Sequence, residues 1–153
     1  MNDVAGCLAC DLTAGRLPLP GGVVAETDYW RVEHTVGPLG VGTLVVKPVR
    51  HVVHVADLTP DEAAELGPLL RTAASVATEL LRPEQVYVCL WSHAGGEPGH
   101  IHFVIQPVSR NSMDRHAAYG PGLQVAMFAA GEPLDEDGVN AFCDRARDGW
   151  SRS

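Results

Sequence analysis

The residues of this chain whose types and spacing suit chemistry fall in two short stretches. Cys7 and Cys10 form a CxxC pair, and His100 and His102 stand two residues apart in the apolar segment HIHFVIQP. Successive side chains of a strand alternate between its faces, so a two-residue step puts both imidazoles on one face. A buried imidazole needs a hydrogen-bond partner, a metal ion or water. The histidine pair therefore indicates a site on a sheet.

A zinc ion would account for the cysteine pair. Zn²⁺ takes four nitrogen or sulfur ligands in a tetrahedron, and a CxxC turn supplies two thiolates. The other two ligands would come from among His51, His54 and His100, whereas His34 and His116 are expected on the surface or in loops. The alternative, a redox-active dithiol, is typical of a βαβ pattern, which the N-terminal segment lacks. Residue types and spacing favour a Cys2His2 zinc site.

The segments that carry these residues predict an α+β fold. A long helix is expected to begin after Thr59, because TPDE supplies an N-cap, a proline at the first helical position and a glutamate at the third. It is expected to end before Pro83. Short apolar runs bounded by turn residues predict strands at 23–26, 30–34, 43–47, 86–91 and 101–106. This order favours a mainly antiparallel five-stranded sheet with the long helix packed on it.

The last third of the chain is expected to be a helical extension of the same domain. Residues 111–122 are predicted to form a loop, residues 123–130 a short helix and residues 135–150 a longer one. A chain of 153 residues has the size of one domain with a substantial core. We therefore expect a main body at 1–110 that includes the N-terminal zinc segment, and an extension at 111–153.

Charge and hydropathy limit the partners. Eleven Lys and Arg against 19 Asp and Glu give a net charge of −8, with one lysine, Lys47, and no basic run. Nucleic-acid binding depends on clustered basic residues that displace counterions, so it is not expected. No apolar run approaches the roughly 20 residues that span a membrane, and the N-terminal segment lacks the features of a signal peptide. A cytoplasmic protein with a small-molecule substrate is expected.

Four segments together resemble the histidine triad (HIT) superfamily. They are CLACDLTAGRLP at 7–18, GTLVVKPVRH at 42–51, LTPDEAAEL at 58–66 and GHIHFVIQP at 99–107. This superfamily includes nucleoside phosphoramidate hydrolases, dinucleoside polyphosphate hydrolases and galactose-1-phosphate uridylyltransferases. The segments occur in the family's order, and the resemblance implies a HIT-like sheet, a nucleotide or phosphate-ester substrate and a homodimer. The apolar run at 123–130 would suit the dimer contact, and a monomer that folds this segment over its own sheet is equally consistent with the sequence.

The resemblance also implies roles for individual residues. In zinc-bearing members the metal is held by the CxxC pair, a histidine after a Pro-x-Arg/Lys segment and the first histidine of the triad. The second histidine of the triad is the family's nucleophile, and it corresponds to His102. His54 competes with His51 for the third ligand position. The ligands of a structural zinc would be Cys7, Cys10, His51 and His100.

Three positions that support phosphate in the family are altered. The third histidine of the triad falls on Val104, and a further histidine that many members carry falls on Thr43. A small polar residue that faces phosphate falls on Glu97, where a carboxylate would repel the phosphate unless it were protonated or paired. If other groups replace the missing donors, the candidates are the side chains of His93 or Ser92 or the backbone N–H groups of Gly95 and Gly96, with Gln106 as a weaker candidate because its side chain would share the face of Val104.

Three functions remain open from the sequence. The leading one is a zinc-containing HIT-like hydrolase or nucleotidyl transferase. It would cleave a nucleotide-type phosphoanhydride, phosphoramidate or phosphoester through a covalent intermediate on His102. The second is a diverged enzyme on a non-nucleotide substrate, in which Glu97 acts as acid or base beside His102. The third is a non-catalytic nucleotide-binding or interaction module.

Overall fold

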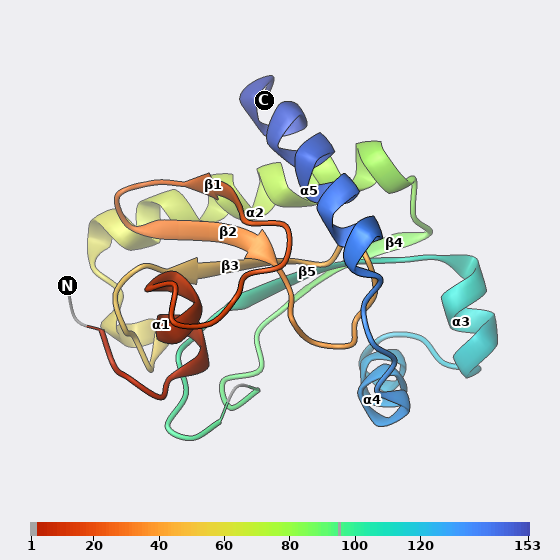
Figure 1. Ribbon diagram of the computed structural model, residues 1–153, viewed down its shortest axis with the longest axis horizontal. Helices are drawn as coiled ribbons and strands as arrows, with labels where there is room; N and C mark the ends of the chain where they lie inside the picture. Colours follow the sequence, from red (N-terminus) through yellow and green to blue (C-terminus); the bar gives the residue numbers. More distant parts are fainter. Residues whose placement is uncertain (1–2, 95) are drawn as a thin grey trace.

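The computed structural model describes residues 3–94 and 96–153 (Figure 1), and its centre is an antiparallel sheet with the strand order β1-β2-β3-β5-β4. The strands are β1 (Val23–Glu26), β2 (Trp30–His34), β3 (Leu44–Pro48), β4 (Gln85–Cys89) and β5 (Phe103–Val108). The helices are α1 (Leu8–Thr13), the 3₁₀ turn η1 (Val55–Asp57), α2 (Pro60–Leu81), α3 (Arg110–His116), α4 (Pro121–Ala130) and α5 (Glu136–Ser151). The predicted α+β class and five-stranded antiparallel sheet are confirmed. Within the described residues, no helix combines the length and apolar character needed to cross a membrane.

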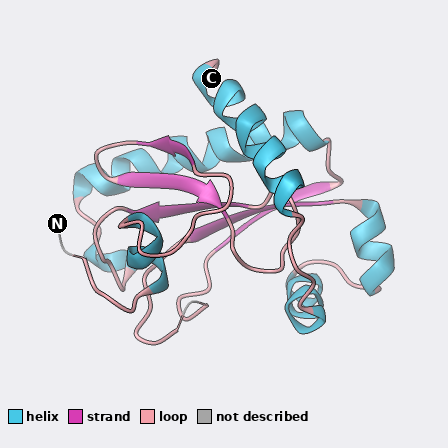
Figure 2. Ribbon diagram, viewed as in Figure 1, coloured by secondary structure: helices cyan, strands magenta, loops and turns pink. Residues whose placement is uncertain are grey.

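One face of the sheet carries the main core. Alternate strand residues, among them Trp30, Val32 and Val46, are buried in one cluster with apolar residues of α2 such as Ala73 and Val76. Helix α5 packs beside α2 and β1 and adds apolar side chains to the same cluster (Figure 2). The opposite face of the sheet carries the candidate site, and residues of α1, of α4 and of loops lie over it.

Helix α2 begins with the predicted capping box. The Thr59 hydroxyl oxygen accepts from the Glu62 backbone N–H (3.2 Å), and Glu62 Oε2 accepts from the Thr59 backbone N–H (2.7 Å). Buried Glu62 also accepts from Arg50 Nε (2.6 Å) and Nη2 (2.8 Å). Hydrogen bonds from Arg50 lower the pKa of the Glu62 carboxyl. The start of α2 is thereby tied to the residue that precedes His51.

The loop predicted at 111–122 is wrong for its first half, which forms helix α3. Ser109 caps this helix, since its side-chain oxygen accepts from the Ser112 backbone N–H (3.1 Å). The helix is short, and Ala117 ends it in a left-handed conformation. A short helix without an apolar stripe leaves little periodic signal, which explains the difference.

The surface position expected for His34 is also wrong. Its side chain is buried at the end of β2, and its ring lies 6.1 Å from that of Phe142. His34 Nε2 accepts from the Gly42 backbone N–H (2.8 Å), so Nδ1 donates to the Thr35 carbonyl (2.8 Å). Burial lowers the pKa of the His34 imidazole, and both ring nitrogens are used by the neutral form.

We expect Glu62→Ala to lower the free energy of unfolding by about 2 kcal/mol, because it removes the cap and leaves Arg50 without its carboxylate. The folded-state pKa of Glu62 is lowered, so this contribution is fully present above the unfolded glutamate pKa of about 4.3 and is lost as the pH falls below it. Urea unfolding at pH 7 and pH 3 measures both effects. Glu79→Ala, on the exposed surface of the same helix, is the control; equal loss in both variants would contradict the assignment.

Candidate metal centre and substrate cavity

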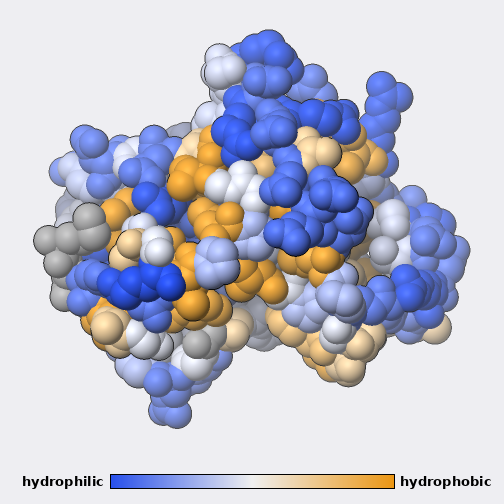
Figure 3. All heavy atoms as spheres, in the orientation of Figure 1, coloured by the Kyte–Doolittle hydropathy of each residue, from blue (hydrophilic) through white to orange (hydrophobic). Residues whose placement is uncertain are grey.

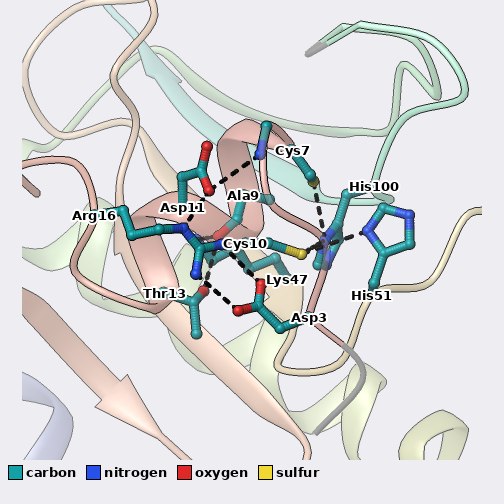
Figure 4. A network of polar contacts seen from close by, with 11 residues as sticks. Asp3, Cys7, Ala9, Cys10, Asp11, Thr13, Arg16, Lys47, His51 and His100 are labelled. Carbon is teal, nitrogen blue, oxygen red and sulfur yellow. Dashed lines mark hydrogen bonds and ion pairs between the residues drawn. The ribbon is translucent and has the colours of Figure 1, made fainter.

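Four metal-ligating side chains from three separate segments converge on one point. Cys7 and Cys10 come from the start of α1, His51 follows β3 and His100 precedes β5, and their ligand atoms all lie within 4.8 Å of one another. His100 Nδ1 lies 3.7 Å from Cys7 Sγ and 3.5 Å from Cys10 Sγ, and His51 Nδ1 lies 3.5 Å from Cys10 Sγ (Figure 4). The structure thus brings together the four residues that the resemblance implies.

The donor set and its spacing fit a zinc ion. A tetrahedron with Zn–S bonds of about 2.3 Å and Zn–N bonds of about 2.0 Å has S···N edges of about 3.5 Å. His100 Nε2 lies 3.0 Å from the Pro48 carbonyl oxygen. Because a carbonyl oxygen can only accept a hydrogen bond, the imidazole proton of His100 is on Nε2. The lone pair of His100 is then on Nδ1, which faces the two thiols. Burial raises the pKa of Cys10 to about 11 and lowers the pKa of His100 to about 4. A bound cation would therefore displace thiol protons.

Polar contacts hold the N-terminal segment together around the CxxC turn and attach it to the sheet. Arg16 binds Asp11 through Nε (2.6 Å) and Asp3 through Nη1 (2.8 Å), as Figure 4 shows. Lys47 of β3 donates from Nζ to the Ala9 carbonyl (3.0 Å). These contacts fix the turn that presents both thiols to the histidines.

His54 lies outside this cluster. It is exposed and precedes the 3₁₀ turn at Val55–Asp57, whereas the half-buried His51 points toward Cys10. Of the two histidines considered from the sequence, His51 is the one that the fold places with the cysteines.

A cavity of about 400 Å³ lies next to the four donors, on the face of the sheet away from α2. His102 and Val104 line it from the β5 side, and Gly96 and Glu97 line it from the loop before β5. His102 precedes the strand, which begins at Phe103 rather than at Ile101. Its Nδ1 lies 3.0 Å from the His100 carbonyl oxygen, so Nδ1 is the donor, and in the neutral ring Nε2 carries the lone pair. His100 and His102 both line this cavity.

The other predicted substrate-binding residues are placed less favourably. Ser92 and His93 are exposed and are not among the described residues that line the cavity. Gly95 lies outside the described residues. Gly96 lines the cavity, but its backbone N–H already donates to the His93 carbonyl (3.1 Å). Buried Thr43 donates its hydroxyl to the Leu39 carbonyl (3.0 Å) and is committed to that loop.

Two charged residues that line the cavity were not singled out from the sequence. Glu33 of β2 and Lys47 of β3 form a buried ion pair, with side chains 3% and 2% exposed. Burial lowers the pKa of the Lys47 ammonium, and Glu33 opposes this shift. The sequence signal that could have found Glu33 is strand alternation, which puts its side chain on the face of β2 away from the core residues Trp30 and Val32.

The C-terminal extension supplies one wall of the cavity. Gln124 and Phe128 of α4 are among the lining residues. Gln124 Nε2 donates to Gln106 Oε1 (3.0 Å), and Gln124 Oε1 accepts from Trp91 Nε1 (3.0 Å). Helix α4 is therefore bonded to β5 and to the segment after β4 within the same chain.

Comparisons with known proteins identify the fold. No family model matches the chain, and no curated protein matches it in sequence. Among solved structures, a Hit-like protein from Bartonella henselae matches with a TM-score of 0.72 at 13% identity, over 97% of this chain and 99% of that chain. A hypothetical histidine triad nucleotide-binding protein from Sulfolobus tokodaii gives 0.71 at 15% identity, over 95% and 93%. A zinc-bound histidine triad family protein from Mycobacterium smegmatis gives 0.67 at 19% identity, over 96% and 94%.

We expect the donor set to bind one Zn²⁺ per chain, and His51→Gln to weaken that binding by more than the roughly 10–100-fold that loss of an outer partner costs. Metal content after dialysis against a competing chelator measures the effect. His54→Gln is the matched control, three residues further along the same segment, and it should retain the ion. Loss of zinc from the His54 variant alone would reverse the ligand assignment.

Proposed function

We propose, on the premise that the chain has the fold of the histidine triad proteins, that it cleaves a nucleotide-type phosphoanhydride, phosphoramidate or phosphoester through a covalent intermediate on His102. The observation that carries this proposal is the state of the His102 ring. Its Nδ1–H donates to the His100 carbonyl, so Nε2 carries the lone pair of the neutral ring, and the residue lines a cavity of about 400 Å³. A neutral imidazole fixed in this tautomer is a nucleophile near pH 7.

The reaction has two steps. In the first, His102 Nε2 attacks the α-phosphorus, a P–N bond forms, and the bond to the leaving group breaks with its electron pair on that group, which takes a proton from solvent. In the second, water attacks the same phosphorus, the P–N bond breaks with its pair returning to Nε2, and the water proton leaves to solvent. The product is a nucleoside monophosphate, or its ester when an alcohol replaces water.

A metal ion held by the four donors would affect the reaction by fixing the position of His100 and, through its carbonyl, the orientation of His102. Cys7, Cys10, His51 and His100 would hold a zinc ion with no open coordination site, and the N-terminal segment would thereby be joined to the residues before β5. The His100 imidazole is then fixed between the thiols and the Pro48 carbonyl. Its own carbonyl orients His102. Oriented in this way, His102 keeps one tautomer throughout the reaction.

The replacement of the third triad histidine by Val104 affects the choice of leaving group. Val104 lines the cavity and offers no proton to a departing oxygen or nitrogen. Without such an acid, a group that leaves as a stable anion, as in a phosphoanhydride, reacts more readily than one that must be protonated. Within the proposed class, phosphoanhydrides are therefore favoured over phosphoramidates of basic amines.

A second candidate function is supported by the position of Glu97. This carboxylate lines the same cavity as His102, where it would repel the charge of a phosphate. A diverged enzyme could use it as an acid or base toward a substrate without phosphate. This candidate differs from the first in predicting no nucleotide turnover.

We expect His102→Ala to reduce release of nucleoside monophosphate from a nucleoside phosphoramidate with a good leaving group at least about 1,000-fold, because the covalent route is lost. Zinc content and circular dichroism should match those of the parent. His54→Ala, at an exposed histidine, should keep full activity. Equal turnover by the parent and His102→Ala would refute the mechanism. No turnover by the folded, zinc-loaded parent would favour the second candidate, with Glu97→Gln as the next variant.

We also propose that the chain forms a homodimer through the outer face of α4. Val125 of this helix is 68% exposed, and Phe128, which also lines the cavity, is 46% exposed; Figure 3 shows apolar side chains on the surface over α4. Apolar residues grouped in this way favour a protein contact.

We expect a dimer by light scattering at micromolar concentration, and a monomer for Val125→Glu. Ser75→Glu, on exposed α2, is the control; a monomeric parent would refute the dimer.

A further inference from the structure

The Glu33–Lys47 ion pair in the cavity is incomplete. Lys47 Nζ donates to Glu33 Oε1 and to the Ala9 carbonyl, which uses two of its three protons. Among the described residues, Glu33 Oε2 is the one buried side-chain nitrogen or oxygen atom without a hydrogen-bond partner. Buried polar atoms are nearly always paired, so this oxygen calls for an explanation.

The pair lies on the same face of the sheet as His102. Glu33 is opposite Val45, and Val45 is opposite Val104, so Glu33 stands two strand spacings, roughly 10 Å, from Val104. Lys47 follows Val45 by two residues and so shares its face. Extending the β3–β5 register by one pair puts position 47 opposite position 102. A ligand whose reacting phosphorus meets His102 can therefore extend across the sheet to Glu33.

Stability does not account for this pair. Removing two charges from water is costly, and replacing a buried ion pair with apolar residues of similar volume is often neutral or stabilising. The unpaired Oε2 adds to the cost. A ligand bound in the cavity could donate a hydrogen bond to Glu33 Oε2 and so supply the missing partner.

The chemistry of the pair restricts that ligand. Glu33 neutralises Lys47, so the pair offers no net positive charge to a phosphate. Its free groups are one acceptor, Glu33 Oε2, and one remaining N–H of Lys47. The surrounding cavity is largely apolar, with Leu8, Val45 and Phe128 among its walls. These surroundings fit a flat apolar ring that carries, side by side on one edge, a hydrogen-bond donor for Glu33 Oε2 and a hydrogen-bond acceptor for the Lys47 N–H. Because Oε2 is recessed, the donor must project from the ring, as an exocyclic amine does.

We propose that Glu33 is a specificity-determining residue that accepts a hydrogen bond from the exocyclic amine of a nitrogen heterocycle, while Lys47 donates to the ring nitrogen beside that amine. This inference rests on the proposed function, since the heterocycle is the base of the nucleotide that His102 attacks. It deepens that function by selecting amine-bearing bases over bases that lack the amine.

The test compares two ligands that differ only in the amine. Adenosine 5′-monophosphate and purine riboside 5′-monophosphate are titrated into the zinc-loaded protein by calorimetry. We expect the parent to bind the adenosine compound at least about 10-fold more tightly, because a site built to bond a polar group rejects the analogue without it. Glu33→Met should reduce this ratio to about 1. Glu79→Met, at an exposed glutamate on α2, should leave it unchanged.

A double variant guards against misfolding. Glu33→Met alone leaves Lys47 with an unpaired buried charge, whereas Glu33→Met with Lys47→Met removes both charges at similar volume and should fold and retain zinc like the parent. This double variant should also bind both ligands equally. Equal binding of the two ligands by the parent, or a preference that survives in the double variant, would overturn the inference and leave the proposed function standing. Failure of the parent to bind either ligand would overturn the inference, and the turnover comparison of the parent with His102→Ala would decide the proposed function separately.

Discussion

The attachment of the N-terminal segment to the sheet is the constraint on which the site depends. Helix α1 has six residues, too few to be stable alone, and it is held by the convergence of its two cysteines on His51 and His100. The same attachment brings residues 4–9 over the cavity and sets the carbonyl that orients His102. Metal binding, cavity shape and the tautomer of the proposed nucleophile are therefore parts of one arrangement.

Local signals in the sequence were sufficient for most of the fold. The TPDE segment specified the start of α2 through contacts within one turn, and the two N-terminal strands were visible as alternating runs around a short turn. Helix α3 was missed because seven residues without an apolar stripe give no period to detect. Residue types and spacing indicated a Cys2His2 site but left His51, His54 and His100 as alternatives, and the family resemblance implied the set that the fold brings together.

The side chains that surround the cavity could not be predicted from local sequence patterns. Strand alternation separates Glu33 from Trp30, but it does not say which face helices cover or which side chain reaches across to Lys47. His34 was misjudged for the same reason, since its partners are backbone groups of the turn after β2. The wall formed by α4 depends on bonds between Gln124 and residues 18 and 33 positions earlier, and no local pattern encodes them.

The burial of Lys47 also determines what kind of surface this protein presents to its surroundings. It is the single lysine of the chain and is 1% exposed, so every side-chain cation on the outside is an arginine or a histidine. Arginine keeps its charge at any physiological pH and is not acylated as an amine is. Enzymes and reagents that modify exposed lysine side chains therefore find no target on the outer surface of the folded molecule, because the one ε-amine is buried in the cavity wall beside Glu33.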